Sequence, residues 1–213
     1  MHPLAWIIAG LARALSGVQV QWQGCVPSER PRVYFANHTS HLDFVVLWSA
    51  LPAKVRVKTR PVAAKDYWEK GLRSYLAQTV FRAVLIERRA SAHENHEQPR
   101  PSALAVIQQL ADALGENDSL IFFPEGTRGR GESVAEFRSG LYHLAKRRPD
   151  VEFVPAYLEN LNRILPKGEI LPVPLLSLLT FGPPIQVKAE ESKPEFLQRA
   201  RDAVCSLRRQ GSH

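Results

Sequence analysis

Short apolar runs typical of buried strands alternate with helical segments along most of this chain. Strand patterns occur in VQVQW, RVYFAN, RAVLIER, SLIFF, VEFVPAYL, LLSLLTFG and IQVK. Strands that alternate with helices predict an α/β fold, in which helices flank a central sheet that is mostly parallel or mixed. A chain of 213 residues with 45% hydrophobic positions can bury one sizeable core, so we expect residues 18–213 to form a single domain.

Five segments have helical length and periodicity. We expect helices in HLDFVVLWSALP, from about Asp66 to Gln78, and in SALAVIQQLADALG, SGLYHLAKRRP and KPEFLQRARDAVCSLRRQ. Proline and glycine mark two of the expected ends, at Pro52 and Gly115.

The stretch AKVRVKTR alternates strictly between apolar and basic residues. It predicts a strand with four cations on one face, namely Lys54, Arg56, Lys58 and Arg60. That face is either a charged edge that discourages aggregation or a surface that meets an anion, and the sequence leaves both open.

The sequence of residues 1–17 predicts an amphipathic helix. It is apolar from Leu4 to Leu15, with Arg13 as the interruption. The run is shorter than the roughly 18 apolar residues of a spanning helix. No positive charge precedes it, as a signal peptide would require. The helix can pack against the body, or lie in a membrane interface with Trp6, Ile7 and Ile8 among lipids and Arg13 near headgroups.

Positive charge is concentrated in the first third of the chain. Residues 1–65 hold eight lysines and arginines against two acidic residues, which accounts for +6 of the formal net charge of +7. This asymmetry indicates an anionic partner, such as nucleic acid, a phosphorylated small molecule, an acidic carrier protein or an anionic leaflet.

The cysteines and histidines give no pattern for a metal or a disulfide framework. Cys25 and Cys205 are far apart and lack C-x-x-C spacing, which favours a reducing compartment, the cytosol by default. His93 and His96 lie in a polar, proline-marked stretch without further ligands nearby. We therefore expect no metal site.

The stretch VYFANHTSHLDFVVLW places His38 and Asp43 between a strand-like run and a helix-like run. Five positions apart, the two side chains cannot meet within one helix. They can meet if His38 lies in the loop and Asp43 in the first helical turn, with Ser40 as the N-cap of a capping box. Asp43 can then hold the imidazole in one tautomer. Alternatively, Asp43 only caps the helix and His38 is a hydrogen-bonded turn residue; we expect His41 to be a surface residue.

Two other strand-like runs end in arginine. FFPEGTRGRG carries Glu125, Arg128 and Arg130 among glycines, and VLIERR ends in Arg88 and Arg89. Glycines let backbone N–H groups converge on an anion, and arginine matches phosphate oxygens with paired hydrogen bonds. Charged groups at three strand ends predict one ligand-binding crevice.

These blocks together make the chain resemble the glycerophospholipid acyltransferases of the 1-acyl-sn-glycerol-3-phosphate O-acyltransferase type. NHTSHLD, AVLIERR, FPEGTR and FVPAYL occur in the family's order, and the resemblance spans roughly residues 18–185. It implies that His38 is the general base and Asp43 its orienting partner. It further implies that Pro155 shapes the pocket and that six residues bind substrate, namely Lys65, Arg88, Glu125, Gly126, Thr127 and Arg128.

The resemblance implies transfer of a fatty acyl group from acyl-CoA or acyl carrier protein to the sn-2 hydroxyl of 1-acylglycerol 3-phosphate, giving phosphatidic acid, with no cofactor. Because the acceptor comes from a bilayer, it favours the interfacial position of the first helix, on the cytoplasmic side of the cell membrane as a peripheral or monotopic protein. G-x-S-x-G is absent, which argues against a serine acyl-enzyme.

Two groups of alternatives remain. One is an acyltransferase that acts on another lysophospholipid. The other is a binding module without catalysis, for an anionic lipid or for nucleic acid. The nucleic-acid form is disfavoured, because the basic segment lacks interleaved aromatics and no nucleic-acid-binding motif is present.

Overall fold

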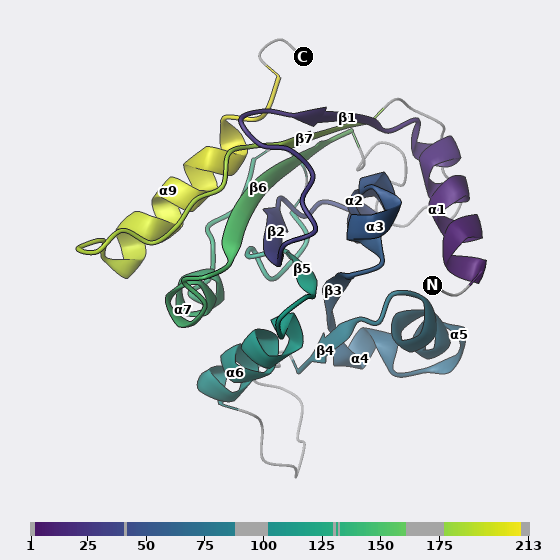
Figure 1. Cartoon of the computed structure of the whole chain (residues 1–213), viewed down its shortest axis with the longest axis horizontal. Coiled ribbons are helices and arrows are strands. Elements are labelled where there is room, and N and C mark those ends of the chain that lie inside the picture. The colour runs from purple at the N-terminus through teal and green to yellow at the C-terminus, as the bar shows by residue number, and fades with distance from the viewer. Residues whose placement is uncertain are drawn as a thin grey trace.

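A seven-stranded sheet with helices on both faces forms the body of the molecule (Figure 1). The computed structural model describes residues 3–40, 42–87, 102–129, 131, 133–160 and 177–209. The expected α/β class with a mixed, mostly parallel sheet is confirmed. The division into residues 1–17 and 18–213 stays a prediction.

The sheet is parallel except at one pair of strands. Its spatial order is β1-β7-β6-β2-β5-β3-β4, and among these described strands only the β6–β7 pair is antiparallel. The strands are β1 (Gln19–Trp22), β2 (Arg32–Ala36), β3 (Thr59–Ala64), β4 (Val84–Ile86), β5 (Ser119–Phe122), β6 (Glu152–Glu159) and β7 (Leu178–Phe181). The five neighbours from β6 to β4 are all parallel, so their carboxyl ends share one edge of the sheet.

Most of the helices are short, and α4 follows strand β3 directly. In chain order they are α1 (Pro3–Ser16), α2 (Asp43–Ala50), α3 (Ala53–Arg56), α4 (Lys65–Trp68), α5 (Gly71–Tyr75), the π-helix η1 (Leu76–Val80), α6 (Ala103–Leu114), α7 (Gly140–Arg147) and α9 (Lys193–Cys205). As the sequence predicts, α2 stops before Pro52 and α6 ends at Gly115.

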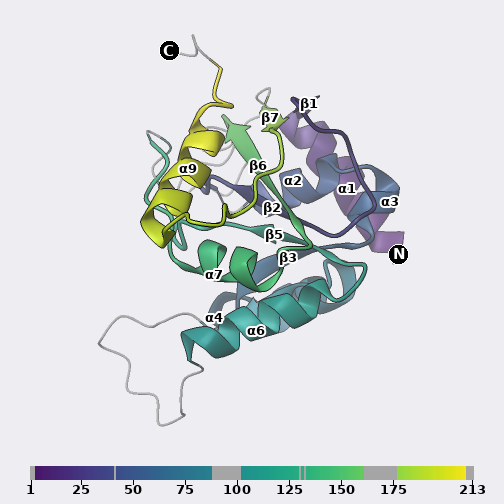
Figure 2. The same ribbon diagram turned by 60° about the vertical axis from the view of Figure 1, so that its left-hand side comes forward.

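Two apolar clusters lie on opposite faces of the sheet, and β2 shows how one strand supplies both. Tyr34 and Ala36 pack into the cluster under α1 and α2, whereas Val33 and Phe35 pack into the cluster under α6, α7 and α9. All five residues of β2 are buried. Both views place α7 and α9 on one side of the sheet and α1 to α3 on the other (Figures 1 and 2). Burial on both faces explains the continuous apolar runs of the central strands.

Helix α1 is hydrogen-bonded through Arg13 to the carboxyl end of α2. Ala5 and Ala9 are buried on its inner face, and Arg13 donates to the backbone oxygens of Ser49 (2.7 Å) and Ala50 (3.2 Å). A cation is favourable there because the last carbonyls of a helix lack intrahelical partners and carry partial negative charge. The expected amphipathic helix is present. No helix in the described residues is long and apolar enough to cross a bilayer.

The predicted basic strand at residues 53–60 is wrong. Residues 53–56 form α3, and β3 begins only at Thr59. Arg56 is buried, donates to the Ser49 and Leu51 carbonyl oxygens, and lies over the ring of Trp48. Arg56 caps the carboxyl end of α2 instead of lying in a strand with Lys54, Lys58 and Arg60, so the four cations do not share one face.

Two further expectations need correction. The single helix expected over residues 66–78 is broken between α4 and α5, where Lys70 is extended and Gly71 has a φ of +58°, and α5 then continues directly into the π-helix η1. The expected strand IQVK is reduced to one isolated bridge between Ile185 and Phe153.

Candidate active site

The predicted site residues follow strands that end at the shared carboxyl edge of the sheet. His38 comes after β2, Lys65 after β3, and the segment 123–129, here called the 123–129 loop, after β5. Arg88 lies just beyond β4 but outside the described residues, as do Arg89, Arg130 and His41. The topology therefore places the carboxyl ends of β2, β4 and β5, after which the sequence predicts the three charged groups, at one edge of the sheet, where open α/β sheets usually bind ligands.

His38 and Asp43 are in contact, which is the first of the two arrangements that the spacing allows. His38 Nδ1 lies 2.9 Å from Asp43 Oδ2, with His38 in the loop and Asp43 at the start of α2. Oδ2 also accepts the backbone N–H groups of Thr39 (2.5 Å) and Ser40 (2.9 Å). Only one half of the expected capping box is present, the hydrogen bond from the Ser40 N–H to Asp43. The other half is missing, because Leu42 rather than Ser40 is the N-cap and no side chain caps the helix.

This arrangement selects the tautomer of His38. Asp43 is fully buried, and an ionised carboxylate can only accept hydrogen bonds, so the proton of the neutral imidazole sits on Nδ1. Nε2 then carries a lone pair. The His38 side chain keeps 18% of its surface exposed, so a ligand can reach it. The geometry is that of an imidazole held in one orientation by a buried carboxylate.

Glu125 joins the 123–129 loop to the His38 loop. Its Oε1 accepts the backbone N–H of His38 at 2.7 Å, and its Oε2 accepts that of Ala135 at 3.0 Å. Burial raises the pKa of Glu125, and these two hydrogen bonds oppose the rise. Because both oxygens are engaged with backbone, the geometry favours a positioning role. Direct binding of a substrate hydroxyl by Glu125 stays a prediction.

The same loop holds the other side of His38. The backbone N–H of Gly129 donates to the His38 carbonyl oxygen at 2.8 Å, so both backbone polar groups of His38 are bound by this loop. Gly126 has a φ of +72°, and a Cβ there would lie 2.6 Å from Arg138 Nε. Only glycine suits this turn without strain.

The predicted anion-binding residues that the structure describes follow the ends of β3 and β5. Thr127 and Arg128 are exposed, and their loop is hydrogen-bonded to the His38 loop through Gly129. Lys65 begins α4 at the end of β3 and pairs with Glu69 and Glu87, each at 3.3 Å; these carboxylates raise its pKa. Pro155 lies in the middle of β6 opposite Phe35, away from the carboxyl edge. The binding and pocket-shaping roles of these residues stay predictions.

Two residues that support His38 were not predicted. The Asn37 side chain bridges β2 to β6, since its Nδ2 donates to the Leu158 carbonyl oxygen (3.0 Å) and its Oδ1 accepts the Leu158 N–H (2.8 Å). Phe123 stacks on the imidazole of His38 with ring centroids 4.3 Å apart. Asn37 and Phe123 are the first residues of the quoted blocks NHTSHLD and FPEGTR, but their contacts depend on which strands are neighbours.

The described residues contain no group of three or more His, Cys, Asp or Glu side chains that could hold a metal ion. The expectation that neither a metal nor a cofactor takes part stays a prediction.

Comparison with known proteins identifies the family. A family model described as "Acyltransferase" matches residues 17–159, which is more than half of the chain and includes the His38 loop and the 123–129 loop. The chain belongs to this acyltransferase family.

Several named proteins are similar to this family member. It is 31% identical over 186 residues to "1-acyl-sn-glycerol-3-phosphate acyltransferase" of Limnanthes douglasii, covering 84% of this chain and 59% of the relative. It is 28% identical over 164 residues to "1-acyl-sn-glycerol-3-phosphate acyltransferase alpha" of Mus musculus, covering 74% and 51% respectively. The matched part of this acyltransferase chain thus spans about half to three fifths of these relatives.

One solved structure supports the fold of this acyltransferase family member. The crystal structure of the 1-acyl-sn-glycerophosphate (LPA) acyltransferase PlsC from Thermotoga maritima matches with a TM-score of 0.69. The match covers 96% of this chain and 77% of that one at 19% identity. At this identity the similarity is evidence for the fold alone.

Proposed function

We propose that this protein transfers a fatty acyl group from a thioester donor to the free sn-2 hydroxyl of 1-acylglycerol 3-phosphate, giving phosphatidic acid. The observation that carries the proposal is the 2.9 Å contact between His38 Nδ1 and the buried Asp43 carboxylate, next to the 123–129 loop. Relatives that bear the name of this activity support the choice of acceptor.

In the proposed mechanism, His38 Nε2 takes the proton of the acceptor hydroxyl as that oxygen attacks the thioester carbonyl. A positioned general base contributes roughly 10² to 10⁴ in rate. The tetrahedral intermediate then collapses, the carbon–sulfur bond breaks, and the imidazolium returns its proton to the departing thiolate. Asp43 stabilises the imidazolium between these two steps. Transfer is direct, and no acyl-enzyme forms.

The phosphate of the acceptor is assigned to Arg128, Arg88 and Lys65, with Thr127 and Gly126 in the same loop as Arg128. A clamped phosphate fixes the free hydroxyl near His38, which replaces a bimolecular encounter by a positioned one. We expect Arg128→Ala to bind the lysolipid more weakly and to lose inhibition by free phosphate. Unchanged substrate dependence would reject the clamp.

We further propose that α1 rests on the cytoplasmic leaflet. Its outer face exposes four large apolar side chains, those of Trp6, Ile7, Leu11 and Leu15. Such a face suits the boundary between headgroups and acyl chains, from which the acceptor must be taken. Flotation with liposomes tests this with Ile7→Ser/Leu11→Ser, which spares the buried Ala5 and Ala9. Equal flotation of variant and wild type would count against the contact.

The decisive assay for the proposed reaction supplies labelled palmitoyl-CoA or palmitoyl carrier protein with a panel of lysolipids, and identifies products by mass. Phosphatidic acid from 1-acylglycerol 3-phosphate is the expected product. Product only from another lysolipid would change the acceptor. No product from any pair, together with salt-dependent binding of nucleic acid or anionic lipid, would favour a binding module.

A further inference from the structure

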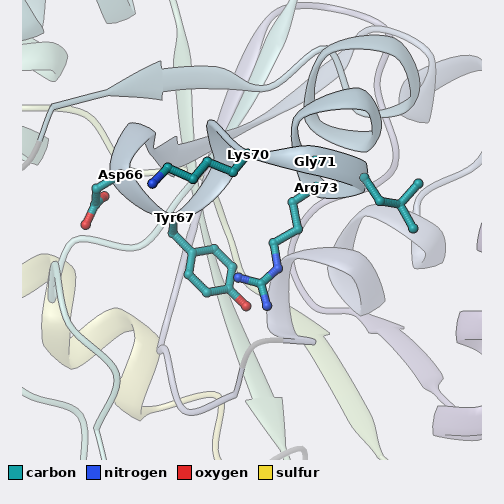
Figure 3. A pocket seen from close by; sticks show the side chains of 6 residues that line it. Asp66, Tyr67, Lys70, Gly71 and Arg73 are labelled. Carbon is teal, nitrogen blue, oxygen red and sulfur yellow. The ribbon is translucent and has the colours of Figure 1, made fainter.

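A hollow of about 450 Å³ lies between α4 and α5, outside the His38 site. Its lining is Asp66, Tyr67, Lys70, Gly71, Leu72 and Arg73 (Figure 3). The hollow exists because the extended Lys70 and the positive φ of Gly71 turn the chain between the two short helices. Its volume falls in the range of roughly 300–1,000 Å³ that is usual for small-molecule sites.

Two cations line this hollow without a carboxylate partner. Neither Lys70 nor Arg73 forms an ion pair with any described residue. The Arg73 guanidinium lies 4.5 Å from the ring centre of Tyr67, which orients its donors. Asp66 also lines the hollow, on the far side from Arg73 (Figure 3). The hollow therefore has a net positive lining, and its arginine can offer paired donors to a phosphate.

Apolar side chains project from the same short helix. Leu72 is 72% exposed and Tyr75 is 45% exposed. In Figure 1, α5 and the outer helix α1 lie on the same side of the molecule. Cations beside exposed apolar residues are the combination that favours the headgroup boundary of a bilayer, where each kind of side chain meets its own environment.

The hollow is also joined by packing to the helix that carries Asp43. Trp68 of α4 meets Phe44 of α2 with ring centroids 5.5 Å apart, and Phe44 directly follows Asp43 in the sequence. Tyr67, Trp68 and Phe44 therefore link the hollow to the helix that begins at Asp43.

We propose that the hollow between α4 and α5 binds the phosphate of an anionic glycerophospholipid in the bilayer. Lys70 and Arg73 contact the phosphate, and Leu72 and Tyr75 enter the lipid beside it. This is a second membrane contact, separate from the substrate phosphate site at the sheet edge. It does not depend on the proposed transfer reaction, because it concerns binding to lipid that is not consumed.

The test is sedimentation with vesicles of phosphatidylcholine containing phosphatidylglycerol, compared with vesicles of phosphatidylcholine alone. The variant is Lys70→Ala/Arg73→Ala. The matched control is Lys146→Ala/Arg147→Ala on α7, on the opposite side of the sheet, which removes the same charge and also a cation over a tyrosine ring. Circular dichroism checks that both variants are folded.

Each basic residue at an anionic surface raises the partition coefficient onto the membrane by about fivefold. We therefore expect the partition coefficient of Lys70→Ala/Arg73→Ala on anionic vesicles to be about 30-fold lower than that of wild type. The control should change by less than about threefold on the same scale. Arg73→Lys keeps the charge but not the paired donors, so its partition coefficient on anionic vesicles should be roughly two- to tenfold lower than that of wild type.

Three results would overturn the proposal. Equal losses in variant and control would mean attraction by overall charge. Full binding by Arg73→Lys would mean that no phosphate is held by the guanidinium. Unchanged vesicle binding, with coenzyme A binding lost in Lys70→Ala/Arg73→Ala, would assign the hollow to a soluble phosphate-bearing donor instead.

Discussion

Replacing Asp43 by asparagine separates the charge of this carboxylate from its geometry. Oδ2 accepts three N–H groups, whereas Oδ1 has no hydrogen-bond partner among the described residues. The asparagine carbonyl oxygen can take the place of Oδ2 and its amide group the place of Oδ1. The His38 tautomer is then retained. The buried amide without an acceptor costs about 1–3 kcal/mol of stability.

The expected loss is in the rate, because the imidazolium formed during transfer no longer faces a negative charge. Unit charges about 4 Å apart at an effective dielectric constant of about 20 attract by about 4 kcal/mol. At 1.36 kcal/mol per tenfold, kcat of Asp43→Asn should fall by about 10³ with little change in KM.

The assay is steady-state acyl transfer, with nitrogen NMR of His38 as the readout of its tautomer. A rate within about tenfold of wild type, in a folded variant with the proton still on Nδ1, would refute electrostatic stabilisation by Asp43. Asp43→Ala is the contrasting variant, because it leaves all three N–H donors unpaired and should destabilise the protein more.

Three further substitutions test the supports of the site and the effect of pH. Gly126→Ala should lower the free energy of unfolding by about 1–3 kcal/mol in urea titrations, since the position needs positive φ and Arg138 fills the Cβ space; wild-type stability would contradict this. In Glu125→Gln the side-chain NH2 group faces one of the two backbone N–H groups that Glu125 binds, so the free energy of unfolding should fall by about 1–3 kcal/mol and the rate of acyl transfer should decrease. Burial raises the pKa of Glu125, so wild-type stability should fall as pH rises through and above the ordinary glutamate range, and Glu125→Gln should lack that component. Arg199 lowers the pKa of Glu191 to about 2, so Glu191→Gln should be less stable than wild type at pH 7, and the difference should vanish as pH falls toward 2; a difference independent of pH would contradict the pairing.

The sequence predicts the sheet and most elements because burial on both faces leaves a continuous apolar run in each central strand. It fails at residues 53–60, where local alternation indicates a strand but Arg56 instead caps the end of α2. Such capping depends on where α2 ends in space and on the tryptophan ring beside it, and neither is visible in an eight-residue pattern.

The sequence likewise indicates one part of the candidate site but not the other. The spacing of His38 and Asp43 at a helix start allows their contact and the family resemblance implies it, whereas the local pattern alone also allows a capping aspartate beside an unrelated turn histidine. The two hydrogen bonds that hold the backbone of His38 join it to Glu125 and Gly129, about 90 positions later in the chain. They require β2 and β5 to be parallel neighbours, which periodicity does not specify.

The most direct test of the proposed mechanism is the single-turnover rate of acyl transfer to 1-acylglycerol 3-phosphate by His38→Gln beside wild type. Glutamine can keep a donor toward Asp43 but has no basic nitrogen at neutral pH. If His38 is the base, phosphatidic acid should form at least about 10²-fold more slowly while the lysolipid still binds. A folded variant that transfers acyl groups within a few-fold of the wild-type rate would contradict the account.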